Sequence, residues 1–194
     1  RWIEEYDLEQ KVKLLYVGRL APEKNLELLI KSLNKLNHKY QDQVELIITG
    51  EGPLLEELKS NTPDNVSFTG YLTGKELSSL YATVDIFAFP SVTETYGNVV
   101  LEAMASGLPV VGVLAGGVKE NLIDGYNGLA AQKDSVEQFS AQLEKVITNE
   151  QLRKRLALNA RQYALNNSWD EIFSNLVANY QKVIDKERQE FRSA

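Results

Sequence analysis

The chain has 194 residues, 43% of them hydrophobic and 25% charged, which is the composition of a globular protein with a buried core and excludes a disordered or fibrous chain. It contains no cysteine and only one histidine, so disulfides, thiolate catalysis, zinc–thiolate sites and clusters of histidine ligands are excluded. The formal net charge of −6 argues against a broad nucleic-acid surface, so any anion that binds must meet a local group of cations.

Short β-branched runs alternate with longer stretches of helical period, as expected for repeated βαβ units. The predicted strands are 12–18, 44–50, 66–71, 86–90, 109–113 and 128–131. The predicted helices are 24–37, 53–60, 75–82, 98–106, 117–123, 134–147, 150–165 and 169–187. Because most of the strands are continuously apolar, we expect a doubly wound α/β fold with one six-stranded parallel sheet covered on both faces.

No repeat or linker divides the chain, so the pattern predicts a single domain over residues 1–194. Ser168, followed by two acidic residues at 170 and 171, predicts the start of the last helix, and residues 188–194 are expected to fray. No apolar run approaches the roughly 18 residues of a membrane-spanning helix, and the first residues do not resemble a signal peptide. A cytoplasmic location is therefore expected, with a peripheral position at a membrane left open for a longer form of the protein.

Two cations follow the first predicted strand, which ends in Gly18. Arg19 and Lys24 flank the loop at the carboxyl end of this strand, where doubly wound sheets bind their ligands. The planar fork of arginine and the point charge of lysine together suit a diphosphate whose charge must be neutralised. The alternative is structural, with Arg19 paired to Glu23 and Lys24 solvated.

The fourth predicted strand leads into a segment that carries two carboxylates and a helix start. Gly97 has no Cβ, so a ligand can approach the amides of Asn98 and Val99 at the positive end of the helix, a phosphate site without side-chain charge. Glu94 precedes this point, and Glu102 follows Asn98 by one turn on the same face, where it can accept the two hydroxyls of a ribose. The alternative is that the helix dipole favours Glu102 and that Glu94 is solvated.

Three further loops carry weaker patterns. Gly50 and Gly52 are typical of a dinucleotide-binding loop, but the third glycine of that pattern is absent and Pro53 at a helix start explains the segment structurally. The loop 115–117 can face the same crevice. The segment that contains Tyr71 and Leu72, after the third strand, can offer backbone donors and acceptors to a planar base.

These segments together resemble a known family. SVTETYGNVVLEAMASGLPVV, with Glu94 and Glu102 in an E-x7-E spacing, resembles the signature of the retaining GT-B glycosyltransferases of family 4. YVGRLAPEKNLELLI, ITGEGPLLEEL, VSFTGYL and GGVKENLIDGYNGL resemble that family's other blocks, in the same order. The resemblance covers about residues 12–187 and implies a Rossmann-like half of the GT-B fold.

The resemblance also implies roles for these residues. Arg19 and Lys24 would hold the diphosphate of a nucleotide sugar, and Glu94 would contact the donor sugar. Phosphate or sugar oxygens would meet the amides at the helix start, the ribose would bind Glu102, and the base would lie near the end of the third strand. The residues implied in substrate binding are Gly18, Tyr71, Leu72, Tyr96, Gly97, Asn98, Val99 and Glu102. The family needs no metal, since cations and helix amides supply the charge.

Two departures from the family are local, and one is large. Tyr96 stands where phenylalanine is commoner, and Asn25 stands where glycine is frequent, although Asn25 can cap the helix. The amino-terminal domain of the family, which carries the sugar or lipid acceptor site, has no counterpart here, and the helix 169–187 would cross back to it. The alternatives are a nucleotide-binding or interaction module without catalysis, a sugar-nucleotide epimerase, and a phosphorylase, for which no cofactor lysine loop is found.

Overall fold

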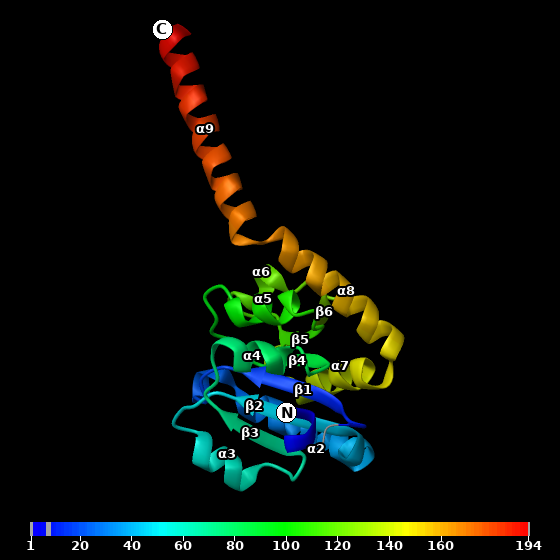
Figure 1. Ribbon diagram of the computed structural model, residues 1–194. Coiled ribbons are helices and arrows are strands. Elements are labelled where there is room, and N and C mark those ends of the chain that lie inside the picture. The colour runs from blue at the N-terminus through cyan, green and yellow to red at the C-terminus, as the bar shows by residue number, and fades with distance from the viewer. Residues whose placement is uncertain (1, 7–8, 194) are drawn as a thin grey trace.

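The computed structural model describes residues 2–6 and 9–193, and a six-stranded parallel sheet forms its centre (Figure 1). The strand order is β3-β2-β1-β4-β5-β6. The strands are β1 (Val12–Val17), β2 (Val44–Thr49), β3 (Val66–Gly70), β4 (Ile86–Phe89), β5 (Val110–Val113) and β6 (Gly128–Ala131). The predicted sheet is confirmed, and each strand lies within one residue of its predicted bounds.

The helices follow the predicted alternation with a few differences at their ends. They are α1 (Trp2–Glu5), α2 (Leu26–Tyr40), α3 (Leu55–Asn61), α4 (Gly74–Tyr81), α5 (Asn98–Ala105), α6 (Val118–Asn121), α7 (Val136–Thr148), α8 (Glu150–Asn166) and α9 (Trp169–Ser193). Helix α1 was not predicted. Helix α9 continues to Ser193, beyond its predicted end at residue 187, and the fraying expected for residues 188–194 stays a prediction.

Helix α2 begins two residues later than predicted, for a backbone reason. Residues Pro22–Lys24 form a short 3-10 turn, and Asn25 then takes the left-handed conformation at φ 54°. The expected cap by the Asn25 side chain is wrong, since this amide donates instead to Asp134 Oδ1 at 3.4 Å. Lys24 therefore lies in a tight turn that faces the end of the sheet.

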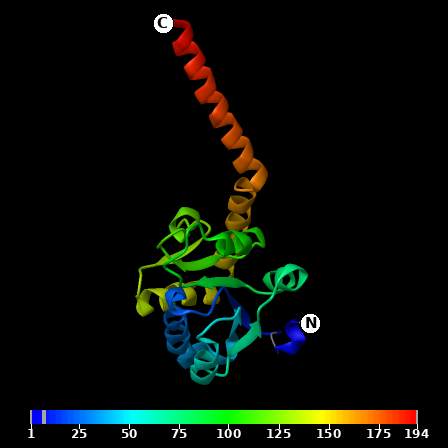
Figure 2. The same ribbon diagram turned by 90° about the vertical axis from the view of Figure 1, so that its left-hand side faces the viewer.

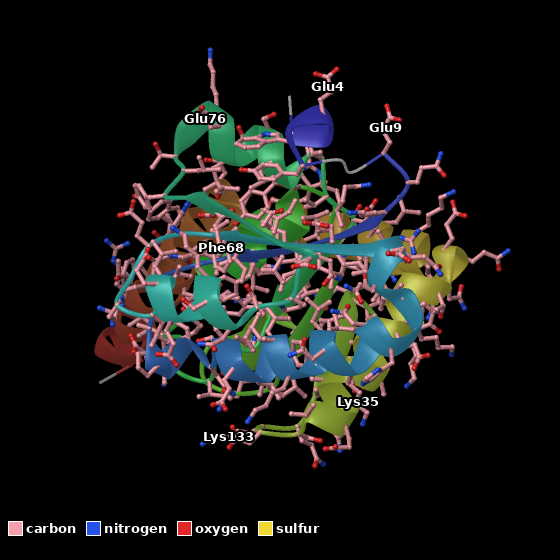
Figure 3. All side chains as sticks on the ribbon, turned by 90° about the horizontal axis from the view of Figure 1, so that it is seen from below. Glu4, Glu9, Lys35, Phe68, Glu76 and Lys133 are labelled. Atoms are coloured by element: carbon pink, nitrogen blue, oxygen red, sulfur yellow. The ribbon has the colours of Figure 1, made fainter. Side chains whose placement is uncertain are left out.

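The helices cover both faces of the sheet. Figure 3 shows α2 and α3 on one side of the sheet and α4 on the other, as right-handed crossovers require. Charged side chains such as Glu76 and Lys133 project outward in that view, while Phe68 lies on the sheet between the helix layers. Helix α2 packs against α7, and α5 packs against α8.

Aromatic residues fill the core beneath the carboxyl ends of the central strands. The rings of Tyr16 and Phe89 stack with centroids 5.9 Å apart, and those of Phe87 and Phe89 stack at 5.5 Å. All three side chains are buried. Stacked rings of this size make a rigid platform under the loops that follow β1 and β4.

The strand order reverses between β1 and β4. The chain runs outward from β1 to β2 and β3 on one side, then returns to pair β4 with the other side of β1. In open parallel sheets, the loops on the two sides of such a point diverge and leave a crevice for ligands. The loop after β1 carries Arg19 and Lys24, and the loop after β4 carries Glu94.

Helix α9 projects away from the body of the molecule, as two views at right angles show (Figures 1 and 2). One of its faces is apolar and exposed. The exposed residues are Trp169, Phe173, Leu176, Val177, Tyr180, Val183 and Ile184. Among the residues that the structure describes, no helix has both the length and the apolar character needed to cross a membrane.

Candidate functional site

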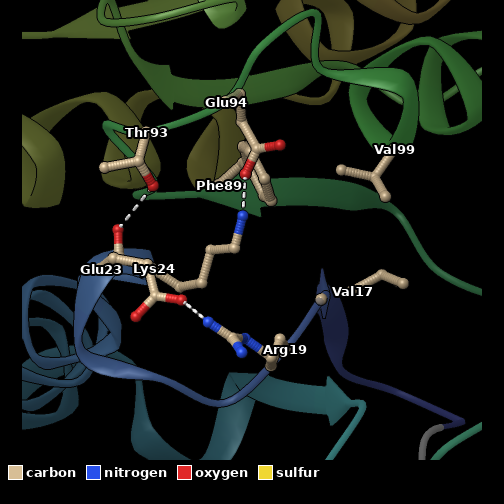
Figure 4. Close-up of a pocket in the computed structure, with 9 residues that line it drawn as sticks. Val17, Arg19, Glu23, Lys24, Phe89, Thr93, Glu94 and Val99 are labelled. Carbon is tan, nitrogen blue, oxygen red and sulfur yellow. Dashed lines mark hydrogen bonds and ion pairs between the residues drawn. The ribbon is translucent and has the colours of Figure 1, made fainter.

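A first cleft of about 590 Å³ opens between the loops after β1 and β4 (Figure 4). Charged residues line it from both loops, and the apolar side chains of the strand ends form its floor. The lining residues are Val17, Gly18, Arg19, Glu23, Lys24, Phe89, Thr93, Glu94 and Val99. The structure thus brings together five of the predicted site residues at the point where the strand order reverses.

The Lys24 ammonium donates to Glu94 Oε1 and forms an ion pair that joins the two loops across the first cleft. The hydroxyl of Ser91 also donates to Glu94 Oε1, at 3.0 Å. Both side chains of the pair are mostly shielded from water, with 19% of Lys24 and 16% of Glu94 exposed. Neither hydrogen bond uses Oε2 of Glu94, which leaves that oxygen available to a ligand.

Arg19 forms the second ion pair of the first cleft. Its guanidinium donates to Glu23 Oε1, one turn along the same loop, and this hydrogen bond lowers the pKa of the Glu23 carboxyl below its ordinary value. The backbone carbonyl of Arg19 accepts a hydrogen bond of 3.1 Å from the buried Tyr16 hydroxyl. The core therefore fixes the backbone of Arg19, while two thirds of its side chain stays exposed to solvent.

A second cleft, of about 530 Å³, adjoins the first and shares Val17, Gly18, Arg19 and Val99 with it. Its other lining residues come from the ends of β2 and β3 and from helices α4 and α5. They are Thr49, Gly50, Glu51, Tyr71, Leu72, Thr73, Gly74, Leu77 and Glu102. Predicted residues from three crossings thus line one continuous crevice.

Tyr81, a buried residue that was not predicted from the sequence, orients the Glu102 side chain. The buried Tyr81 hydroxyl donates to Glu102 Oε2 at 3.4 Å. Burial, and secondly the charge of Glu102, raise the pKa of Tyr81 well above its ordinary value, so its hydroxyl keeps its proton. Glu102 therefore presents an acceptor carboxylate to the second cleft.

The start of α5 is arranged as predicted around Gly97. This residue has φ 79°, and its carbonyl accepts from the Val100 amide at 2.9 Å. In the described part of the chain, the amides of Asn98 and Val99 make no backbone hydrogen bond. They are the free donors that a helix start offers to an anion.

Tyr96 and Asn98 line a separate groove and neither of the two clefts. Together with Glu102 they line an apolar groove against the end of α8 and the start of α9, which includes Trp169 and Ile172. The backbone carbonyl of Tyr96 accepts a hydrogen bond of 2.6 Å from the Asn121 side chain. Of the predicted residues, these two and Gly97 do not line the two clefts.

The glycines after β2 have a packing role. A Cβ on Gly50 would lie 2.0 Å from the carbonyl oxygen of Gly18, and a Cβ on Gly52 would lie 2.3 Å from that of Leu20. The Leu20 amide donates to the Glu51 carbonyl at 2.8 Å. These contacts hold the loops after β1 and β2 side by side, which supports the structural alternative to a dinucleotide loop.

Ser91, Tyr81 and Tyr16 lie behind the lining of the crevice and support it, and sequence reasoning missed them. Each acts through one hydrogen bond to a residue that was predicted, and each is buried. A buried hydroxyl at a strand or helix end carries no distinctive spacing in the sequence. Among residues 2–6 and 9–193, no group of three or more His, Asp or Glu side chains is placed to hold a metal ion.

The model of the family described as "Glycosyl transferases group 1" matches residues 1–163 of the chain. The chain belongs to this family. The match includes both clefts, so the glycosyltransferase domain and the crevice described above coincide. Arg19, Lys24, Glu94 and Glu102 all lie within the matched residues.

Curated relatives share a quarter to over a third of their residues with this glycosyltransferase domain. Sulfoquinovosyl transferase SQD2 of Arabidopsis thaliana is 37% identical over 164 residues, which cover 82% of this chain and 31% of that protein. A GDP-mannose-dependent alpha-mannosyltransferase of Mycobacterium tuberculosis is 36% identical over 168 residues, which cover 87% of this chain and 42% of that protein. The chain thus spans between about a third and a half of the length of such relatives.

Solved structures share the fold of this glycosyltransferase domain. HepE of Anabaena, in complex with UDP and glucose, superposes with a TM-score of 0.80 at 24% identity, over 94% of this chain and 51% of that one. The C-terminal domain of LpcC, a glycosyl transferase group 1 family protein from Francisella tularensis, gives 0.71 at 23% identity, over 84% of this chain and 90% of that one. The chain therefore has the Rossmann-like fold of a carboxyl-terminal GT-B domain.

Proposed function

We propose that this domain binds the nucleotide-sugar donor of a retaining glycosyltransferase. Within a longer protein, a hexosyl group would pass from this donor to an acceptor hydroxyl. The observation that carries the proposal is the continuous crevice between β1 and β4, with Arg19 and Lys24 in the first cleft and Glu102 in the second. Cations at one end and an acceptor carboxylate at the other match the order of diphosphate and ribose in such a donor.

The diphosphate lies in the first cleft in this proposal. Arg19 and Lys24 bind its oxygens, and the free amide of Val99, which lines this cleft, adds a donor at the positive end of α5. The free amide of Asn98 is the next donor at the same helix start, although Asn98 does not line the cleft. As the bond from the sugar to the phosphate breaks, negative charge grows on the leaving oxygen. Two cations and fixed amides stabilise that charge without a metal, which is why we propose that no metal is needed.

The nucleoside lies in the second cleft. Glu102 accepts the ribose hydroxyls, with its carboxylate held by Tyr81, and the base lies against the backbone of Tyr71 and Leu72. Gly18 leaves room for the link between the two clefts, which share this residue. In this proposal, Tyr96 and Gly97 act by placing the start of α5.

The sugar lies beside Glu94. Donor binding draws the Lys24 ammonium toward the diphosphate, and Glu94 then accepts sugar hydroxyls. Retention at the anomeric carbon follows if the acceptor attacks from the face that the leaving phosphate occupies, with no nucleophile from the enzyme. The acceptor, a sugar or a lipid, binds mainly to an amino-terminal domain outside this chain, so we expect the 194 residues alone to bind donor weakly and to transfer nothing.

The relatives support a nucleotide-sugar donor and leave its base open. One solved neighbour is described as a complex with UDP and glucose, and several curated relatives are described as GDP-mannose-dependent. Titration of the chain with UDP, GDP and ADP, and then with their sugar conjugates, tests the proposal by calorimetry. We expect one nucleotide to bind and Glu102→Ala to remove that binding.

Glu137→Ala is the matched control, because Glu137 is an exposed carboxylate on α7 that lines neither cleft. It should leave the affinity unchanged. The proposal fails if no nucleotide binds, or if Glu102→Ala binds as tightly as the unmodified chain.

A further inference from the structure

Glu23 places a negative charge inside the cleft that is proposed to receive a diphosphate. Its carboxylate pairs with Arg19, and its backbone carbonyl accepts a hydrogen bond of 3.2 Å from the Thr93 hydroxyl (Figure 4). The first contact lies within the loop after β1, and the second joins this loop to the one after β4. Glu23 is therefore held at the edge of the first cleft from both sides.

The charges of the first cleft cancel in the absence of a ligand. Arg19 and Lys24 contribute two positive charges, and Glu23 and Glu94 contribute two negative ones. Glu94 has a proposed task, since it meets the sugar. Glu23 has none in the donor complex, because a carboxylate next to Arg19 competes with phosphate oxygens for the same guanidinium.

The diphosphate group carries a different charge in the donor and in the product. The diphosphate of a nucleotide sugar is esterified at both ends and carries two negative charges. In the transfer, the bond between the anomeric carbon and the phosphate oxygen breaks, its electron pair stays on that oxygen, and the acceptor oxygen bonds to the carbon. The acceptor proton passes to solvent, so the nucleoside diphosphate carries a third negative charge above about pH 6.

We propose that Glu23 is a positioning residue for the Arg19 guanidinium. Their ion pair holds the guanidinium in place in the empty cleft, and the diphosphate of the donor displaces Glu23 from it. The ion pair forms again when the more highly charged product leaves. The inference rests on the proposed donor site. Repulsion by the Glu23 carboxylate grows with the charge of the bound diphosphate, so it weakens the product more than the donor. A site built only to attract anions would instead hold its product more tightly than its donor.

The test compares Glu23→Gln with the unmodified chain in calorimetric titrations with UDP, UDP-glucose, GDP and GDP-mannose. At pH 8 we expect the variant to bind the nucleoside diphosphate about three- to tenfold more tightly, the effect of one unit charge in a partly solvated site. The nucleotide sugar, with two charges in place of three, should gain two thirds of that free energy, which is about two- to fivefold. At pH 5.5 the two gains should converge, because the terminal phosphate then keeps a proton.

Glu27→Gln is the matched control. Glu27 pairs with Lys31 one turn along α2, in the same i,i+4 arrangement, but it does not line either cleft. It should change no affinity at either pH. Thermal unfolding of both variants reports whether the loss of an ion pair has disturbed the fold.

Three outcomes overturn the inference. Weaker binding of every nucleotide by Glu23→Gln would mean that Glu23 only orients Arg19, and equal gains for product and donor at pH 8 would mean that it does not discriminate between them. In both cases the proposed function stands, because the unmodified chain binds. Absence of binding by the unmodified chain would remove the proposed function and the inference together.

Discussion

At the residue scale, two ion pairs keep the cations of the first cleft in place before any ligand arrives. Arg19 and Lys24 carry long side chains that would otherwise sample many rotamers, at a cost of up to about 2 kcal/mol each on binding. Glu23 and Glu94 reduce that freedom. In the proposed complex, the diphosphate takes the place of a carboxylate as the anionic partner of each cation.

Removal of either cation should weaken nucleoside diphosphate binding. We expect Arg19→Ala and Lys24→Ala each to cost about 1 to 3 kcal/mol, the loss typical of a charge-assisted hydrogen bond. Calorimetric titration of the nucleotide that binds the unmodified chain measures this. Lys31→Ala is the control, because Lys31 is an exposed cation on α2 outside the clefts. Unchanged affinity in both variants would remove the site assignment.

At the scale of elements, the crevice depends on how closely the loops after β1 and β2 approach each other. Gly50→Ala places a Cβ against the backbone of Gly18, where no flexible side chain can give way. We expect a loss of about 2 to 4 kcal/mol in the free energy of unfolding, from backbone overlap added to the strain of a positive φ. Urea denaturation measures it.

Gly125→Ala separates the strain of a positive φ from the backbone overlap expected in Gly50→Ala. Gly125 has φ 73°, but a Cβ there would meet nothing within 4 Å. It should therefore lose only the roughly 1 to 2 kcal/mol of left-handed strain. Equal losses in the two variants would show that close approach of the loops contributes nothing.

The sequence predicted the elements well because each one carries its own local signal. Buried parallel strands are continuously apolar, and the amphipathic helices between them have a clear 3.6-residue period. Arg19, Lys24 and Glu94 could be selected because they lie in loops that follow strand ends, where the fold places its ligands. Glu102 could be selected because it lies one turn after the start of α5, on the same face as Asn98. The family match includes all four of these residues.

The partners of these residues could not be predicted in the same way. Lys24 and Glu94 are 70 positions apart, and their pairing depends on β4 returning beside β1. The hydroxyls of Tyr81 and Ser91 matter only through their distances to Glu102 and Glu94. The turn before α2 depends on the left-handed conformation of Asn25, which residue type favours but does not dictate.

At the scale of the whole molecule, the body and α9 differ in how they are stabilised. The sheet and its covering helices bury a continuous apolar core, whereas α9 leaves large apolar side chains in water. An isolated helix gains little beyond its own hydrogen bonds, and most helical stability in proteins comes from a packed apolar face. Helix α9 therefore contributes little to the stability of this chain.

Amide hydrogen exchange should reveal this difference in a single experiment. We expect amides in α9 beyond Phe173 to exchange at least about 100-fold faster than those of α7, because opening α9 exposes little additional apolar surface. Helix α7 is the internal control, since it packs against α2 and buries Phe139 and Leu143. Slow exchange in α9 at every protein concentration would mean that it folds back onto the body. Protection that rises with concentration would mean that a second copy covers its apolar face, which would equally contradict an unpacked helix.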